Sequence, residues 1–354
     1  MTRVWDVPVH DSTRLRDVRV AAKEVCGRAG FDEDRGAAAE LVTTELATNL
    51  LKHAGGGQIL LETVDAELGS GASAPQPALQ IVAIDHGLGI PDLSAALGDG
   101  FSTTASLGAG LGTCGRLADD FEVHSSPGRG TVALARIHAS RRSGPKSRRS
   151  PGPVWAGGVN VPLVAGHSGD AWACVRSGER VTLLLADGLG HGPQAAEASD
   201  AAVRQLRRSA HLAPPELLAV LHGALRSTRG AAVAVAQLDL AAERLEFSGI
   251  GNIGARFRTG DNWQHLLSHP GIVGAHRPAR IPHLRLPWSS DCLLVLHSDG
   301  LPSRWSLRPD VPSAVLDPGV TAALIVRDAS SSARPVRDDT AVTVLSPTPS
   351  NREP

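Results

Sequence analysis

A short basic segment divides the 354-residue chain into two halves with different patterns. Residues 140–153 read SRRSGPKSRRSPGP, which combines Pro, Gly, Ser and positive charge and offers no apolar side chain to a core. This composition is typical of a flexible linker. Single hydrophobic cores also rarely grow to the length of this chain. We therefore predict two domains, at residues 1–139 and 154–348, with residues 349–354 as a tail.

The composition excludes several classes of protein. The chain has 35 Lys and Arg against 36 Asp and Glu, so it lacks the overall field of a nucleic-acid or membrane-surface protein. The basic segment itself is short and carries no aromatic residue, which favours a linker over a nucleic-acid contact. The 4 cysteines are far apart in sequence, so we expect neither a disulfide framework nor a structural zinc site. With no signal peptide or membrane span in the sequence, we expect a cytoplasmic protein without nucleic-acid or membrane partners.

In the first half, helical periodicity precedes strand-like runs. Leu15, Val18 and Ala22 recur at helical spacing behind Asp11, and a second helix is expected from about Asp32 to His53. Strands are expected at residues 58–64, 78–84, 121–125 and 131–137. Helices followed by a mostly antiparallel sheet predict an α+β two-layer sandwich.

The second half alternates helices and strands more densely. Strands are expected at residues 171–176, 181–186, 231–239, 243–249, 253–258, 292–297 and 340–345, and helices at 193–211, 214–228 and 312–326. Many strands flanked by helix pairs predict a four-layer α/β/β/α sandwich.

The second expected helix carries a polar face. Glu45, Asn49 and Lys52 are four and seven positions apart, which places them on one side of a helix. The Asn49 amide oxygen is a hard ligand that suits Mg²⁺, and Glu45 is placed to accept a proton from a nucleophile approaching a phosphate. A solvated face of a surface helix has the same pattern and remains an alternative.

The elements that follow strengthen a nucleotide interpretation. The apolar run 81–84 ends at Asp85, whose carboxylate can accept the exocyclic amine of adenine. Gly87 and Gly89 leave room for a planar ring against the backbone. Residues 100–112 form a glycine-rich segment whose backbone N–H groups can cradle phosphates.

In this order the first-half motifs resemble the GHKL ATPases (the Bergerat fold), and among them the bacterial serine kinases that control anti-sigma factors and stressosome scaffolds. The resemblance implies that Glu45 is the catalytic base, Asn49 the ligand of the Mg²⁺ bound with ATP, and Asp85 the adenine anchor. It also implies an ATP-binding role for further residues: Lys52, Gly87, Gly89, Gly108, Gly110, Gly112 and Thr131. The expected substrate is a STAS-domain anti-sigma antagonist or stressosome scaffold protein. Domains of this fold also grip sigma factors, so an ATP-binding, partner-binding module without kinase activity is the alternative.

The second half carries four aspartates beside small residues: Asp170, Asp187, Asp299 and Asp338. Carboxylates gathered from distant positions are costly unless cations neutralise them. Hard oxygen ligands suit Mg²⁺ or Mn²⁺, and a pair of such ions can activate water for attack on a phosphate ester. Any one Asp-Gly pair can be an ordinary turn.

The four motifs together resemble the SpoIIE-type branch of the metal-dependent PPM/PP2C phosphatases. That resemblance implies that Asp187 bridges two metal ions and that the Gly188 carbonyl joins one of them. Asp299 and Asp338 complete the other site, Asp170 is an outer or partial ligand, and Asp339 competes with Asp338. The segment 248–252 (SGIGN) departs from the Ala-Gly-His of many relatives. The expected activity is metal-dependent phosphoserine and phosphothreonine protein phosphatase.

Together the two motif sets predict a bifunctional enzyme of a bacterial partner-switching pathway. One domain uses ATP and Mg²⁺ to phosphorylate Ser or Thr of a partner, and the other uses Mn²⁺ or Mg²⁺ to remove phosphate.

Overall fold

The computed structural model describes residues 4–65, 76–97, 110–140, 152–164, 166–276, 278–330 and 338–349. Gly108, most of the predicted phosphate-binding segment and most of the predicted linker lie outside these ranges. Within them, no helix is long and apolar enough to cross a bilayer.

The N-terminal half is an α+β sandwich, as predicted. Its five-stranded antiparallel sheet has the order β1-β2-β3-β5-β4. The elements are β1 (Val4–Val9), α1 (Arg14–Ala29), α2 (Glu33–Ala54), β2 (Gly57–Asp65), β3 (Pro77–Ile84), α3 (Leu93–Leu97), α4 (Leu111–Leu117), β4 (Asp120–Ser126) and β5 (Gly130–His138). The edge strand β1 was not predicted. It pairs along β2 from Val4 opposite Glu62 to Val9 opposite Gly57.

Helix α2, which carries the predicted kinase residues, has clear boundaries. The Asp32 carboxylate accepts a hydrogen bond from the Arg35 N–H at 2.8 Å and caps the first turn. Gly55 ends the helix in the left-handed conformation, with φ of 72°. The prediction of a helix from about Asp32 to His53 is thereby confirmed.

The C-terminal half contains two stacked five-stranded sheets, in the orders β13-β10-β9-β8-β7 and β12-β11-β14-β15-β6. Its elements are β6 (Val154–Val161), β7 (Asp170–Ser177), β8 (Arg180–Gly188), α5 (Pro193–Ser209), α6 (Pro214–Ala224), β9 (Ala231–Asp239), β10 (Arg244–Ile250), β11 (Gly254–Thr259), β12 (Asn262–Leu266), β13 (Leu284–Pro287), β14 (Cys292–His297), α7 (Pro318–Ala329) and β15 (Thr340–Pro347). Helices α5 and α6 cover the first sheet and α7 the second, so the predicted α/β/β/α arrangement is confirmed. Strands β6, β12 and β13 were not predicted.

The last helix begins later than the sequence periodicity indicated. We expected a helix over residues 312–326, but α7 begins at Pro318. Proline favours the first helical turn, and the Asp317 carboxylate caps it by accepting the Gly319 N–H at 2.7 Å. Residues 312–317 (PSAVLD) lie before the helix and form turns.

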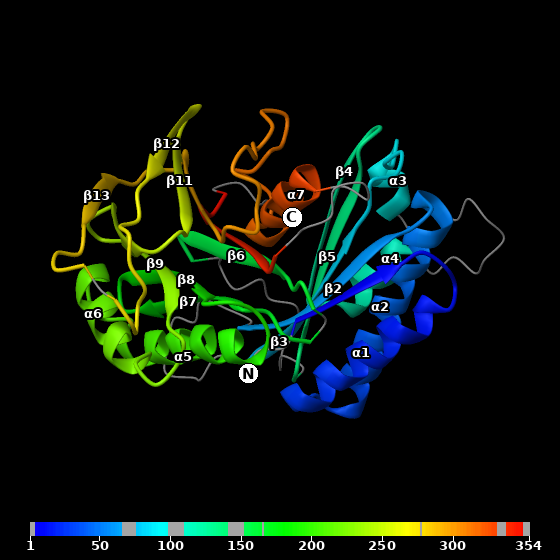
Figure 1. Ribbon diagram of the computed structural model, residues 1–354. Helices are drawn as coiled ribbons and strands as arrows, with labels where there is room; N and C mark the ends of the chain where they lie inside the picture. Colours follow the sequence, from blue (N-terminus) through cyan, green and yellow to red (C-terminus); the bar gives the residue numbers. More distant parts are fainter. Residues whose placement is uncertain are drawn as a thin grey trace.

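Helix α7 lies between the two halves of the molecule, with β4 and β5 on one side and β6 on the other (Figure 1). One apolar cluster joins Leu60, Val82 and Leu134 of the N-terminal sheet to Val320 and Leu324 of α7. The opposite face of that sheet packs on α1 and α2. Because both faces of the sheet are covered, successive residues are buried on both sides of β3 and over residues 59–62 of β2.

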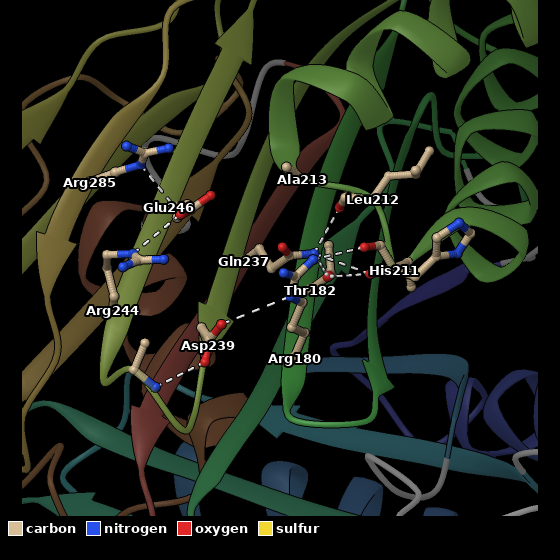
Figure 2. Close-up of polar contacts among 12 residues, drawn as sticks. Arg180, Thr182, His211, Leu212, Ala213, Gln237, Asp239, Arg244, Glu246 and Arg285 are labelled. Carbon is tan, nitrogen blue, oxygen red and sulfur yellow. Dashed lines mark hydrogen bonds and ion pairs between the residues drawn. The ribbon is translucent and has the colours of Figure 1, made fainter.

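A buried glutamine joins the outer sheet of the C-terminal half to its helices (Figure 2). The Gln237 amide donates to the carbonyl oxygens of Ala210 and Leu212 at 3.1 and 2.9 Å. The same amide donates to the Thr182 hydroxyl at 2.9 Å, so it links β9 to β8 as well. The connection between α5 and α6 is thereby held against this sheet. The same sheet carries Asp170, at the start of β7, and Gly188, at the end of β8.

Candidate functional sites

The polar face of α2 carries the predicted catalytic and Mg²⁺-binding residues on one side, as its spacing required. Glu45 is half-buried; burial raises the pKa of its carboxyl, and the charge of Lys52 lowers it in part. The Asn49 side-chain nitrogen is buried and has no hydrogen-bond partner among the described residues. In the predicted mechanism these groups would lie next to the γ-phosphate of ATP and its Mg²⁺.

Asp85 lies at the end of β3, beside the C-terminal end of α2. Its carboxylate is 7% exposed and accepts the Gly87 N–H at 2.8 Å. Burial raises the pKa of Asp85, while the backbone donors and the charges of His86 and Arg327 lower it. A methyl group on Gly87 would lie 2.9 Å from Ala54, so α2 and this turn approach too closely for any other residue.

The β4–β5 turn closes the other side of the Asp85 carboxylate. A side chain on Gly130, which has φ of +90°, would lie 2.1 Å from the Asp85 carbonyl oxygen. The next residue, Thr131, contacts the Ser125 hydroxyl at 3.0 Å, and that hydroxyl accepts the Ile90 N–H at 2.7 Å. The turn after β3 and the β4–β5 turn therefore form one hydrogen-bonded unit around the predicted adenine anchor.

Only part of the predicted phosphate clamp is described. Gly110 precedes α4 and Gly112 lies in its first turn, while Gly108 is outside the described residues. Cys114, in the same helix, is fully buried, and burial together with the charge of Glu45 raises the pKa of its thiol to about 12. Cys114 is thus an inert buried thiol that packs α4 close to the Glu45 carboxylate.

In the C-terminal half, Asp170 and Asp187 face each other across the first residue pair of β7 and the end of β8. Asp170 is 4% exposed, and neither of its carboxylate oxygens makes a hydrogen bond of ordinary geometry among the described residues. Burial and the neighbouring Asp187 raise its pKa well above the usual range, and the Ser298 hydroxyl offsets this only in part. A buried carboxylate without donors fits a cation partner.

Asp187 and Asp299 extend this acidic cluster. Burial, followed by the charges of Asp299 and Asp338, raises the pKa of Asp187 to about 7. Burial and Asp338 also raise the pKa of Asp299, and a hydrogen bond from Asn252 lowers it. The Asn252 amide donates to the Asp299 carboxylate at 2.5 Å. Gly188 completes the end of β8, where a side chain would lie 2.1 Å from the Ala195 carbonyl oxygen at the start of α5.

The structure distinguishes the two adjacent aspartates that compete in the sequence. Asp339 is 5% exposed, and its two oxygens accept the N–H groups of Leu163 and Gly169, each at 2.7 Å. Asp338 is exposed to solvent beside the cluster. Both oxygens of Asp339 are thus committed to the backbone, whereas Asp338 accepts the Asp339 N–H with one oxygen at 2.8 Å, and its charge acts on Asp187 and Asp299.

The donor set fits divalent cations in charge and in ligand type. Several carboxylates raise one another's pKa, and all are hard oxygen donors of the kind that Mg²⁺ and Mn²⁺ prefer. As they stand, the described residues contain no group of three or more His, Cys, Asp or Glu side chains that could hold an ion. The fit therefore rests on the unpartnered Asp170 carboxylate and the mutual repulsion, not on a closed coordination shell.

Two family models match the chain. The histidine kinase-like ATPase domain matches residues 9–136, and Stage II sporulation protein E (SpoIIE) matches residues 177–347. The serine/threonine-protein kinase RsbT of Bacillus subtilis (strain 168) is 39% identical over 117 residues, which are 33% of this chain and 83% of RsbT. The chain joins an RsbT-like kinase domain to a SpoIIE-type PP2C phosphatase domain. This combination is typical of partner-switching regulators.

Solved structures match the chain at lower similarity. A chain from work on the bacterial stressosome is 25% identical, with a TM-score of 0.47, and the match covers 54% of this chain and 98% of that one. The SpoIIE phosphatase domain of Bacillus subtilis, with a fragment of its regulatory domain, is 15% identical with a TM-score of 0.46. That match covers 96% of this chain and 98% of the SpoIIE chain.

Two contributions to these sites were not predicted from the sequence. Asn252 was noted only as a departure from a motif, yet it is the hydrogen-bond donor of Asp299. Arg327 of the phosphatase domain lies beside Asp85 of the kinase domain, and it had no signal in the kinase motifs. The sequence does place Arg327 directly after the apolar run 318–326. A charged residue at the end of a buried helix requires a partner, and this was the available indication of its role.

Proposed function

We propose that the chain sets the phosphorylation level of a STAS-domain partner, with the RsbT-like domain adding phosphate to Ser or Thr and the SpoIIE-type domain removing it. The observation that carries the phosphatase half is the buried, unpartnered Asp170 carboxylate facing Asp187 across β7 and β8. The kinase half is supported by Glu45 and Asn49 on one face of α2 and by the enclosed Asp85.

In the kinase domain, the Asp85 carboxylate is suited to accept the adenine amine, and its N–H donor from Gly87 fixes its orientation. Asn49 would hold the Mg²⁺ of the nucleotide and Lys52 would face the phosphates. Glu45 would take the proton from the partner's hydroxyl, a role that its raised pKa favours.

In the phosphatase domain, Asp187 would contribute to both cation sites and the Gly188 carbonyl to one of them. Asp299 and Asp338 would complete the other site, with Asp170 as an outer or partial ligand. When bound, the two ions supply charge compensation and an activated water for attack on the phosphate ester. Asn252 orients the Asp299 carboxylate, and Asp339 holds the backbone of the loop before β7 in place.

Both halves can be tested with the purified full chain. Labelled ATP and STAS-domain proteins from the same genome should give a labelled partner, and Glu45→Gln should abolish the label. Mn²⁺-dependent hydrolysis of para-nitrophenyl phosphate should be lost in Asp187→Ala. No transfer to any partner contradicts the kinase half, and hydrolysis that survives Asp187→Ala contradicts the phosphatase half. Nucleotide-dependent capture of a sigma factor without transfer would instead support the partner-binding alternative.

A further inference from the structure

The C-terminal end of helix α7 touches the nucleotide-site turns of the other domain. Arg327 is 1% exposed, and its guanidinium donates to the Gly130 carbonyl oxygen at 3.4 Å. The His86 imidazole contacts the Arg327 carbonyl oxygen at 3.0 Å. His86 directly follows Asp85 in sequence and Gly130 directly precedes Thr131, so α7 contacts both turns that enclose the adenine anchor.

The burial of Arg327 makes this contact energetically important. A buried guanidinium is costly unless it is paired, and here Nε and Nη2 both lie 2.9 Å from the Asp328 carboxylate. The remaining nitrogen is directed to the kinase domain, and the charge of Arg327 also acts on Asp85. Arg129, beside Gly130, lies 3.6 Å from the same Asp328 carboxylate. The charged group therefore fixes the β4–β5 turn from the phosphatase side.

The N-terminal end of α7 is fixed to the kinase sheet as well. Arg136 of β5 makes two contacts with the Asp317 carboxylate, at 2.6 and 2.9 Å, and donates to the Gln80 amide oxygen at 3.0 Å. The Asp317 N–H donates to the Glu122 carboxylate at 3.0 Å. Both ends of the helix are thus held by polar contacts to the N-terminal sheet.

The opposite side of α7 packs on β6 and β15 of the phosphatase sheet. The approach to β6 is close, since a side chain on Gly157 would lie 2.5 Å from the Gly319 nitrogen. Strand β15 begins at Thr340, directly after Asp338 and Asp339. Helix α7, which has no exposed face, therefore contacts the two turns around Asp85. It also contacts β15, the strand that directly follows Asp338 and Asp339.

We propose that Arg327 is a positioning residue of the adenine-nucleotide site, contributed by the phosphatase domain, and that α7 thereby makes nucleotide and cation occupancy of the two sites interdependent. This goes beyond the proposed function, because it requires nucleotide binding but no phosphate transfer. Any coupling is reciprocal in binding free energy.

The direct test is equilibrium binding of Mg²⁺ and a non-hydrolysable ATP analogue to the full chain by titration calorimetry. Arg327→Met should weaken analogue binding about tenfold, Arg327→Lys should retain most of it, and exposed Arg308→Ala should match the wild type. Thermal melting without nucleotide reports whether each variant is folded. Wild-type affinity in folded Arg327→Met, or no analogue binding by the wild type, overturns the proposal.

If Arg327→Met does not fold, Asp328→Asn tests the same contact, because it removes the counter-charge that holds the guanidinium in place. Folded Asp328→Asn should also bind the analogue more weakly than Arg308→Ala. Affinity equal to that of the control overturns the proposal.

Coupling to the phosphatase domain has its own readout in hydrogen exchange. The analogue is added with Mg²⁺ to the Asp187→Asn chain, so that the ion reports on the nucleotide site alone. Exchange should slow in residues 322–330 of α7 and at the start of β15, while α6 is unchanged. Slowing that is confined to residues 4–140 overturns the coupling.

Discussion

Asp85 of the kinase domain and Asp170 of the phosphatase domain are almost equally buried, at 7% and 4% exposure, but their surroundings are opposite. Asp85 accepts the Gly87 N–H and lies near the positive charge of Arg327. Asp170 has no hydrogen bond of ordinary geometry among the described residues and faces Asp187. Asp85 is therefore preorganised by the protein alone, whereas Asp170 would need cations for the same stabilisation.

The difference explains how one chain can carry two phosphate chemistries. A carboxylate with fixed donors can select a neutral ring by accepting its amine, and it needs no ion to remain in place. Carboxylates that repel one another favour the binding of divalent ions, and bound ions can activate water for attack on a phosphate ester. In the proposed function, the same residue type thus serves recognition in one domain and metal binding in the other.

The largest effect is expected from a substitution in the acidic cluster of the phosphatase domain. Asp187→Ala should lower Mn²⁺-dependent hydrolysis of para-nitrophenyl phosphate about a thousandfold, equivalent to roughly 4 kcal/mol in the barrier. Addition of Mn²⁺ should raise the melting temperature of the wild type but not of the variant. Exposed Arg308→Ala should behave as the wild type in both assays. Equal stabilisation by Mn²⁺ in Asp187→Ala would show that the acidic cluster does not hold the ions.

The next prediction concerns Arg136, the positively charged partner of Asp317. Arg136→Met leaves the Asp317 carboxylate, which is 19% exposed, without its bidentate partner. The free energy of unfolding in urea should fall by about 3 kcal/mol. Arg14→Met removes a matched but exposed ion pair to Asp17 and should cost about 0.5 kcal/mol or less. Equal losses in the two variants would mean that the contact between α7 and the kinase sheet adds no stability.

Asp338 and Asp339 allow the comparison to be made between adjacent residues. Asp339→Asn replaces one carboxylate oxygen that accepts a backbone N–H by a donor, and should cost about 2 kcal/mol of stability in the presence of EDTA. Asp338→Asn should leave that stability unchanged but reduce the rise in melting temperature on addition of Mn²⁺. The reverse pattern would assign the metal to Asp339.

The sequence predicted the α+β and α/β/β/α classes, helix α2 and most interior strands, because these depend on local periodicity and capping. It predicted Asp85, Asp170 and Asp187 as residues at strand ends, which local pattern also determines. It did not predict β1, β6 or the start of α7, since short edge strands and proline-initiated helices have weak periodicity. The position of α7 between two sheets was not predicted either, because packing between domains leaves no periodic signal. The run 81–84 of β3, apolar on both faces, is the trace that it left in the sequence.

The last prediction concerns Glu62, a buried carboxyl between the two domains. Among the described residues, neither an ion pair nor an N–H donor is found for its Oε2. It lines a cavity of about 110 Å³ together with Arg136 and Trp172. Burial raises the pKa of Glu62 to about 8, and the neighbouring Trp172 indole lowers it only in part. The folded chain therefore keeps this proton at neutral pH.

The sign of the pH effect follows from the raised pKa. An unfolded glutamate loses its proton near its ordinary pKa of 4.5, whereas the folded protein holds it up to about 8. The free energy of unfolding should thus fall by about 1.4 kcal/mol per pH unit between those values and level off above them. Glu62→Gln removes this slope, so the difference between the urea unfolding free energies of variant and wild type should grow from pH 6 to pH 8. A constant difference over that range would show that Glu62 is ionised in the folded protein and that the domain boundary tolerates an unpaired charge.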